Sequence, residues 1–166
     1  MAEDRGVPHC ASSPTEVSVE HVDLHAALTK LLRWASREAV ARELAGPAAA
    51  GLSPTDLWLL DGIVRSGPVR MGDIATWQGV DKSTVTVQLR RLADRGLVVR
   101  RADPSDARAV LVSASDAGRL LHRDVSRQGA RVLAGLLADW DPADRRDLAR
   151  LVSRFADDLG PGPRAR

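Results

Sequence analysis

The chain has 166 residues, of which 44% are hydrophobic and 28% charged, so it can bury a core and is neither a disordered nor a fibrous protein. It has no tyrosine, one phenylalanine and one cysteine, Cys10, which excludes an internal disulfide and favours helices over a sandwich of aromatic-rich strands. The formal net charge is only +2, and no apolar run of about 20 residues or secretory signal is present, so we expect a soluble cytoplasmic protein.

The N-terminal part of the chain is predicted to be a tail followed by a long helix. Residues 1–17 mix proline, serine, glycine and charge without periodicity, which is typical of a flexible tail. Between residues 18 and 46, apolar residues recur every three or four positions, so we expect one helix of about seven turns. Because a small domain seldom needs so long a helix, part of its apolar face is expected to meet a partner chain.

The next helix is predicted to begin at Pro54. Ser53 is suited to the N-cap, Pro54 to the first helical position, and the acidic Asp56 to the positive end of the helix dipole. This helix is expected to end at Gly67-Pro68 and to bury an apolar stripe made of Leu57, Leu60, Ile63 and Val64.

Two shorter helices and a hairpin follow. The first helix is predicted from Met71 to Gln78, with Ile74 and Ala75 facing inward, and the second, capped by Asp81 or Ser83, runs to about residue 95 before Gly96. Residues 97–101 and 108–112 then have an extended pattern around a turn at residues 103–106, which predicts a β-hairpin. From residue 115 the pattern is helical again, with two helices separated near residues 141–142.

The second of the short helices separates into two faces on a helical wheel. Its inward residues are Val85, Leu89 and Leu92; its outward residues are Ser83, Val87, Arg90, Arg91 and Asp94, flanked by Thr84 and Thr86. Residues 82–101 also carry six basic residues against one acidic residue. Two helices followed by a hairpin can place such a face in a major groove about 12 Å wide, although charge alone is equally typical of a solvated surface.

Short motifs follow one another in order along this part of the chain. They are Gly67-Pro68-Val69, Asp73-Ile74-Ala75, Gly79-Val80-Asp81-Lys82-Ser83-Thr84-Val85-Thr86, Arg91-Leu92, Arg95-Gly96-Leu97-Val98, Arg100, and Asp103-Pro104-Ser105-Asp106-Ala107-Arg108. The ordered set resembles the MarR family of bacterial transcription regulators. The resemblance implies a fold that is mainly α with a small β-wing, and an obligate homodimer.

The resemblance also implies how the chain is divided. A winged helix-turn-helix at residues 53–113 is expected between dimerisation helices at 18–46 and 115–160, all within a single domain at 18–160, with a C-terminal tail at 161–166. Each winged helix-turn-helix of the dimer would bind one half of a pseudo-palindromic operator in double-stranded DNA.

DNA-binding roles carry over to matching positions. Ser83, Thr84, Thr86 and Arg91 match recognition-helix positions that contact bases or phosphates in the family, and Lys82, Val87 and Arg90 of the same helix are expected to join them. Asp106 and Arg108 match the family's wing motif, in which the arginine would enter a minor groove and the acid would hold the wing. Val87 and Ala107 stand where the family often has cations, so thymine methyl groups and groove shape are expected to carry part of the base preference. Arg70 stands where a hydroxyl cap is usual.

Several of these residues have alternative interpretations that involve no DNA contact. Arg90 or Arg91 could pair with Asp94, Arg108 could be a solvated loop arginine, and Ser83 could only cap its helix.

A small-molecule site is a further expectation from the resemblance. Arg33, Trp34, Arg37 and Trp58 lie where the family's effector pocket forms, so an aromatic or anionic effector could bind there and change the spacing of the DNA-binding helices. The alternative is that the tryptophans belong to the core or an interface. Cys10 lacks the tyrosine partners of peroxide-sensing relatives, and His9, His21, His25 and His122 are expected to be surface or core residues rather than metal ligands.

These features predict a sequence-specific regulator of transcription, acting as a repressor that a small-molecule effector releases, with no cofactor. The alternative is an architectural or protein-interaction module that uses the winged fold without reading sequence. An enzyme is not expected, because the sequence has no Gly-rich phosphate loop after a strand and no Ser-His-Asp pattern.

Overall fold

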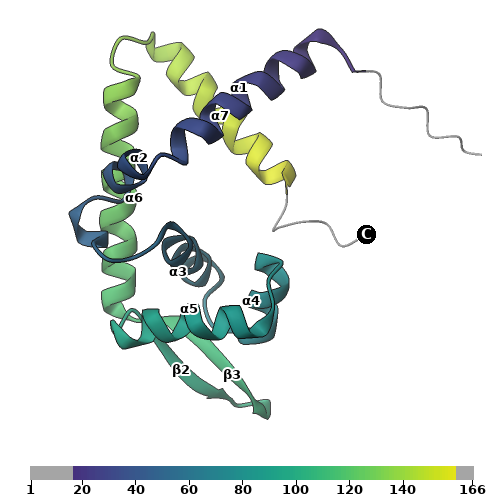
Figure 1. The fold of residues 1–166 in the computed structure, drawn as a ribbon, viewed down its shortest axis with the longest axis vertical. Helices are drawn as coiled ribbons and strands as arrows, with labels where there is room; N and C mark the ends of the chain where they lie inside the picture. The colour runs from purple at the N-terminus through teal and green to yellow at the C-terminus, as the bar shows by residue number, and fades with distance from the viewer. Residues whose placement is uncertain (1–16, 160–166) are drawn as a thin grey trace, which may run out of the picture. The chain divides into compact units, whose positions relative to one another are not determined.

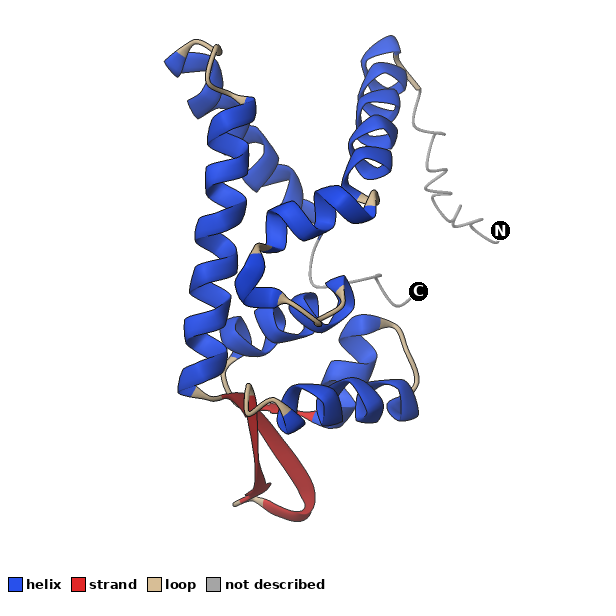
Figure 2. Ribbon diagram, turned by 60° about the vertical axis from the view of Figure 1, so that its left-hand side comes forward, coloured by secondary structure: helices blue, strands red, loops and turns tan. Residues whose placement is uncertain are grey.

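The computed structural model describes residues 17–159, apart from the side chains of Ala107 and Arg108. These residues are mainly helical, with one small antiparallel sheet, as predicted (Figure 2). They divide into two compact units, residues 17–37 and residues 38–159, which we describe separately. The expected tail at 161–166 and nearly all of that at 1–17, with His9 and Cys10, lie outside the described residues. Within residues 17–159, no helix is both long and apolar enough to cross a membrane.

The predicted helix from residue 18 to 46 is two helices, so this expectation was wrong. α1 (Val19–Ala35) ends where Arg37 N–H donates to the carbonyl of Trp34 at 3.2 Å, and α2 (Glu38–Ala45) begins directly afterwards. The Ser36 hydroxyl donates to the carbonyl of Arg33 at 3.1 Å, a local hydrogen bond that competes with continuation of the helix. The apolar spacing continues across the break, so periodicity alone does not reveal it.

The second unit contains the remaining elements. After α2 come the 3-10 helix η1 (Pro47–Ala49), α3 (Pro54–Ser66), β1 (Val69–Arg70), α4 (Met71–Gln78), α5 (Lys82–Asp94), β2 (Val98–Asp103), β3 (Asp106–Ala114), α6 (Asp116–Leu136) and α7 (Pro142–Leu159) (Figure 1). The sheet order is β1-β3-β2 with antiparallel pairs, and Val69 lies opposite Val112. The two-residue strand β1 was not predicted, because it depends on pairing with a segment about 40 residues away.

Helix caps explain where the main helices begin. Ser53 caps α3 as predicted, its hydroxyl accepting from Asp56 N–H at 3.2 Å. Asp81, rather than Ser83, caps α5 by accepting from Thr84 N–H at 2.9 Å. Ser115 caps α6 and also donates to the carbonyl of Gly96 at 2.6 Å, which ties the start of this long helix to the turn before β2.

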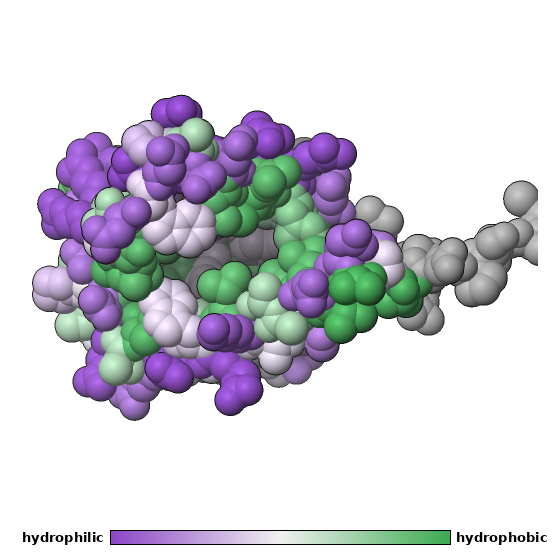
Figure 3. Space-filling model, turned by 90° about the horizontal axis from the view of Figure 1, so that it is seen from above, coloured by the Kyte–Doolittle hydropathy of each residue, from purple (hydrophilic) through white to green (hydrophobic). Residues whose placement is uncertain are grey.

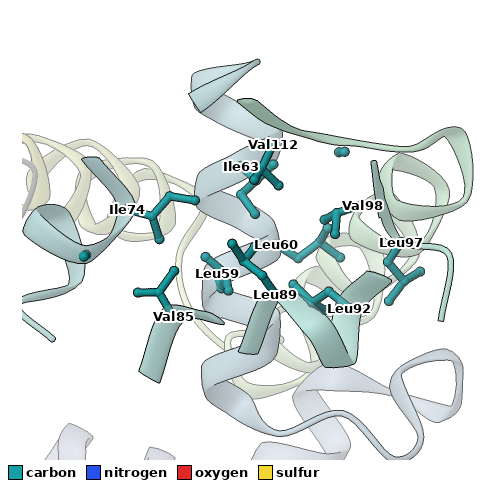
Figure 4. Packing of buried hydrophobic residues seen from close by; sticks show 12 residues of the cluster. Leu59, Leu60, Ile63, Ile74, Val85, Leu89, Leu92, Leu97, Val98 and Val112 are labelled. Atoms are coloured by element: carbon teal, nitrogen blue, oxygen red, sulfur yellow. The ribbon is translucent and has the colours of Figure 1, made fainter. Parts of the chain in front are cut away.

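The core lies between α3, α4, α5 and the sheet (Figure 4). The inward positions predicted for α4 and α5 are confirmed: Ile74, Ala75, Val85, Leu89 and Leu92 are all buried. Each fully buried leucine or isoleucine contributes about 1.5–3 kcal/mol relative to an exposed one.

The buried stripe of α3 differs from the prediction. It consists of Asp56, Leu59, Leu60 and Ile63, together with Gly62, whereas Leu57 and Val64 are only partly buried. The stripe starts at an acidic residue, which a pattern of hydrophobic residues cannot place inside.

Two glycines mark close packing around α3 and α6. A Cβ atom added to Gly62 would overlap the ring of Trp77, so the indole of α4 lies against the backbone of α3. A Cβ on Gly118 would overlap the carbonyl oxygen of Leu97, so the start of α6 lies against the start of β2. These contacts require glycine and fix α4 and α6 on the core.

Both units expose apolar side chains that a small soluble protein would otherwise bury. In α7 no residue is buried, and the exposed apolar side chains are Leu148, Leu151, Val152, Phe155 and Leu159. In α1 they include Val19, Val22, Leu24, Leu31 and Leu32. Figure 3, viewed from the end away from the hairpin, shows green apolar side chains reaching the surface among purple charged ones.

Candidate nucleic-acid interface

The candidate site is formed by α5 and by the wing, the name used below for the β2–β3 hairpin. α4 ends at Gly79, whose left-handed backbone (φ 65°, ψ 28°) turns the chain toward Asp81 and α5. Of the α5 residues predicted to contact DNA, Lys82, Ser83, Thr86, Val87, Arg90 and Arg91 are exposed and Thr84 is partly buried. The outward face of α5 is therefore as the sequence predicted.

The hydroxyl groups at the start of α5 are bonded to the helix cap. Asp81 accepts hydrogen bonds from the hydroxyl of Ser83 and from the hydroxyl of Thr84, the latter at 3.1 Å. Together with the Thr84 N–H, these bonds lower the pKa of the Asp81 carboxyl to about 2, the Ser83 hydroxyl having the largest effect. The Thr86 hydroxyl donates to the carbonyl of Lys82 at 2.7 Å. A DNA phosphate would need these hydroxyls to rotate away from their present acceptors.

The two neighbouring arginines of α5 have different surroundings. Arg90 Nε lies 4.0 Å from Asp94 Oδ2, and both side chains are more than two-thirds exposed, at 81% and 71%. Arg91 Nη2 lies 3.0 Å from Oδ1 of Asp56, whose side chain is only 3% exposed. The pairing of Arg90 with Asp94 was one of the alternatives considered, whereas Asp56 as the partner of Arg91 was not foreseen.

The wing is held at its turn by a carboxylate with several donors. Asp103 accepts from the Ser105 hydroxyl at 2.6 Å, from the Ser105 N–H at 2.8 Å and from Arg70 Nε at 2.8 Å. These contacts, the Ser105 hydroxyl foremost, lower the pKa of the Asp103 carboxyl to about 2, and the same pair raises the pKa of Arg70. Because Arg70 is the N-cap residue of α4, the wing is bonded to the helix-turn-helix.

The remaining predicted wing residues lie on β3. The Asp106 backbone is opposite Asp103 in the sheet register. Arg108 belongs to β3, but its side chain lies outside the described residues, so its entry into a groove stays a prediction. Arg100 and Arg101 of β2 are exposed and add positive charge to the wing.

The predicted effector residues belong to both units. Arg33, Trp34 and Arg37 lie at or just after the C-terminal end of α1, where Trp34 is partly buried. Trp58 lies on α3 and is 68% exposed, so it is not a core residue of its own unit. The pocket that these residues would form stays a prediction.

Two of the histidines have side-chain hydrogen-bond partners. His122 Nε2 lies 2.8 Å from Oδ1 of Asp61, and His21 Nδ1 lies 2.9 Å from the Ser18 hydroxyl. Among residues 17–159, no group of three His, Cys, Asp or Glu side chains is placed to hold a metal ion.

Sequence reasoning missed three residues that organise this site. Asp56 was assigned only to the helix dipole, Arg70 only to a departure from a family pattern, and Asp103 only to a turn. Each acts through a contact with a residue more than 30 positions away, for which the sequence has no periodic signal.

Known proteins resemble this chain in sequence. A model of the MarR family matches residues 50–109. The chain is 28% identical over 112 residues to YdgJ of Bacillus subtilis, an uncharacterised HTH-type transcriptional regulator, covering 68% of each protein. It is 24% identical over 106 residues to the HTH-type transcriptional repressor MdtR of the same bacterium, covering 64% of this chain and 68% of MdtR.

Solved structures resemble it in fold. RV1404 from Mycobacterium tuberculosis superposes with a TM-score of 0.70 at 24% identity, over 89% of this chain and 99% of the other. Streptococcus pneumoniae FabT, in a structure of its complex with DNA, superposes with a TM-score of 0.56 at 18% identity, over 84% and 93% of the two chains. At these identities the structural likeness establishes the fold.

Proposed function

We propose that the protein is a DNA-binding transcriptional regulator of the MarR family, whose model matches residues 50–109, and that it acts as a homodimeric repressor of a pseudo-palindromic operator, released by a small aromatic or anionic molecule. The observation that carries the proposal is the exposed basic face of α5 beside a wing that is bonded to α4. An α-helix fits the major groove, and a basic hairpin can reach the neighbouring groove.

The dimer is supported by the apolar residues that α7 leaves exposed. Leu151 and Val152 are 51% and 55% exposed on a helix without any buried residue. A second copy of the chain would cover such a face. A twofold dimer would then present two α5 helices to half-sites about one helical turn apart, ~34–36 Å.

Repression is supported by MdtR, which is named as a repressor. Exposed Trp58 offers an aromatic face, and Arg33 and Arg37 offer positive charge for an anionic group. A molecule that binds the DNA-incompetent arrangement more tightly would shift the dimer away from the operator.

The proposal is tested by selecting duplexes from a random-sequence library with the wild-type protein and sequencing those retained. We expect enrichment of a pseudo-palindrome with half-sites about 10 bp apart, and a footprint of the same length on the selected duplex. Equal binding of all duplexes would instead indicate an architectural module. A thermal-shift screen of aromatic acids, followed by assays of DNA release, tests the effector; a library without any compound active in both assays would contradict it.

A further inference from the structure

The buried carboxylate of Asp56 joins the start of α3 to α5. Its Oδ2 atom accepts from Ser53 N–H at 3.0 Å and from the Ser53 hydroxyl at 2.7 Å. Its Oδ1 atom accepts from Arg91 Nη2 at 3.0 Å. With its side chain only 3% exposed, Asp56 needs a cation to compensate for lost hydration, and Arg91 supplies that charge.

Arg95, the residue directly after α5, reaches the same segment. Arg95 Nη1, one helical turn beyond Arg91, donates to the carbonyl of Ala50 at 2.8 Å. Residues 50–56 are thus bonded to α5 and to its C-cap residue, at two points a turn apart. Gln88, on the same side of α5 one turn earlier, is also buried, with 8% exposed.

These polar contacts can fix the rotation of α5 about its axis. The apolar side chains of Val85, Leu89 and Leu92 bury α5, but dispersion and hydrophobic contacts have little directional preference. Charge-assisted hydrogen bonds are directional. A change at Arg91 would therefore allow α5 to rotate about its axis while its apolar side chains stay buried. The rotation determines which of the outward residues, such as Val87, face the bases.

A phosphate contact that draws Nη2 of Arg91 away from Asp56 would conflict with this arrangement, although the Arg91 side chain is 52% exposed. If the guanidinium turned toward DNA, the Asp56 carboxylate would stay buried without its cation, which is strongly unfavourable. Arg90, with its long contact to the exposed Asp94, can turn toward a phosphate at little cost.

We infer that Arg91 is a positioning residue, which sets the orientation of α5 through Asp56, and that Arg90 beside it makes the phosphate contact. The inference rests on the proposed sequence-specific binding, and it assigns to Arg91 a different role from the DNA contact implied by family resemblance.

The test compares full-length Arg91→Gln, Asp56→Asn, their double variant and Arg90→Gln. Each is titrated with a duplex selected by the wild-type protein and with a random duplex of equal length, at salt concentrations between about 50 and 200 mM. We expect Arg91→Gln and Asp56→Asn each to lower the affinity for the selected duplex roughly tenfold and to leave the affinity for the random duplex almost unchanged. The double variant should bind like the single ones, with an unchanged salt slope.

Arg90→Gln is the matched control, because it removes the same charge from the adjacent position. It should lower the affinity for both duplexes. It should also make the dependence of log affinity on log salt concentration shallower by about one per subunit. The same behaviour in Arg91→Gln, or additive losses in the double variant, would overturn the inference. The inference would also be overturned if Arg91→Gln, at the same folded fraction as wild type, kept the wild-type ratio of affinities for the selected and random duplexes. Arg91 would then only stabilise the fold.

A measurement on the wild-type protein covers the case in which Asp56→Asn does not fold. The guanidinium NMR signals of Arg91 should stay unchanged when the selected duplex is added, while those of Arg90 should shift. A shift at Arg91 of the same size would overturn the inference. Failure of the proposed function would appear differently, as equal affinity of the wild-type protein for both duplexes.

Discussion

The Nη2 atom of Arg70 lies 2.6 Å from Oδ2 of Asp103, so the N-cap residue of α4 is bonded to the last residue of β2. The same guanidinium group donates to the Ser105 hydroxyl at 3.2 Å. The wing is also paired with β1 at residues 111–112. The Arg70 bonds hold its turn against the helix-turn-helix, so that wing and α5 can meet DNA together.

Protonation of Asp103 should therefore destabilise the protein in acid. Folding lowers the pKa of this carboxyl from 3.8 to about 2, chiefly through the Ser105 hydroxyl. A pKa that is lower in the folded state gives a stabilisation that is complete above 3.8 and is lost as the pH falls through about 2. Urea unfolding of wild type and Asp103→Asn should differ most near neutral pH and converge near pH 2.

Arg70→Met removes only one of the groups that lower the pKa of Asp103. It leaves both Ser105 bonds to Asp103, so part of the pH-dependent difference from Asp103→Asn should remain. Asp81, whose pKa is also about 2, is present in all three proteins and cancels in their comparison. A stability difference that did not vary with pH would contradict the role of the Asp103 carboxylate.

Val87 should influence base preference more than overall affinity. Its side chain is 58% exposed on the outward face of α5 and offers only methyl groups, which suit a thymine methyl. Val87→Arg should change the preferred base at one position of each half-site toward guanine, with discrimination of about 1–3 kcal/mol. Repeating the duplex selection with this variant and with Val87→Ala measures the effect; an unchanged preference in both would remove Val87 from the interface.

Arg108 should act on DNA of any sequence. A guanidinium in the minor groove responds mainly to phosphate charge and groove width. Arg108→Ala should therefore lower the affinity for both the selected and the random duplex. The salt slope should become shallower by about one per subunit. Wild-type affinity of Arg108→Ala for the selected duplex at physiological salt would show that the wing assignment is wrong.

The packing of Trp77 on Gly62 makes a prediction about stability. A methyl group at position 62 would overlap the indole ring, so Gly62→Ala should destabilise the protein by about 1–3 kcal/mol. Gly72 is the matched control, since it is also helical but has open space around its Cβ position. Gly72→Ala should stabilise the fold by up to about 1 kcal/mol. Equal effects of the two changes in thermal unfolding would contradict the packing.

The parts of this fold that sequence predicts are those governed by local pattern. Val85, Leu89 and Leu92 recur at helical spacing, so their burial followed from periodicity. Helix starts at Ser53 and Asp81 followed from capping chemistry. Both signals lie within a few residues of the feature that they predict.

The parts that sequence did not predict depend on contacts between distant segments. Asp56 faces inward because Arg91, 35 positions later, neutralises it, and no pattern of hydrophobic residues contains that information. Arg70 and Asp103 are likewise 33 positions apart. The break at Ser36 is local, but its hydroxyl only weakens the helix, and the apolar spacing continues across the break.

The apolar face of α7 should be required for dimerisation. Val152 is 55% exposed on this face, so Val152→Glu would place a charge in the proposed interface, where its desolvation is costly. Sedimentation should then show monomers, and affinity for a duplex with two half-sites should fall toward that for one half-site. Arg146→Gln changes the net charge equally on the opposite side of α7 and should leave the dimer intact. A Val152→Glu dimer as stable as wild type would place the interface elsewhere, whereas folded monomers would assign it to α7.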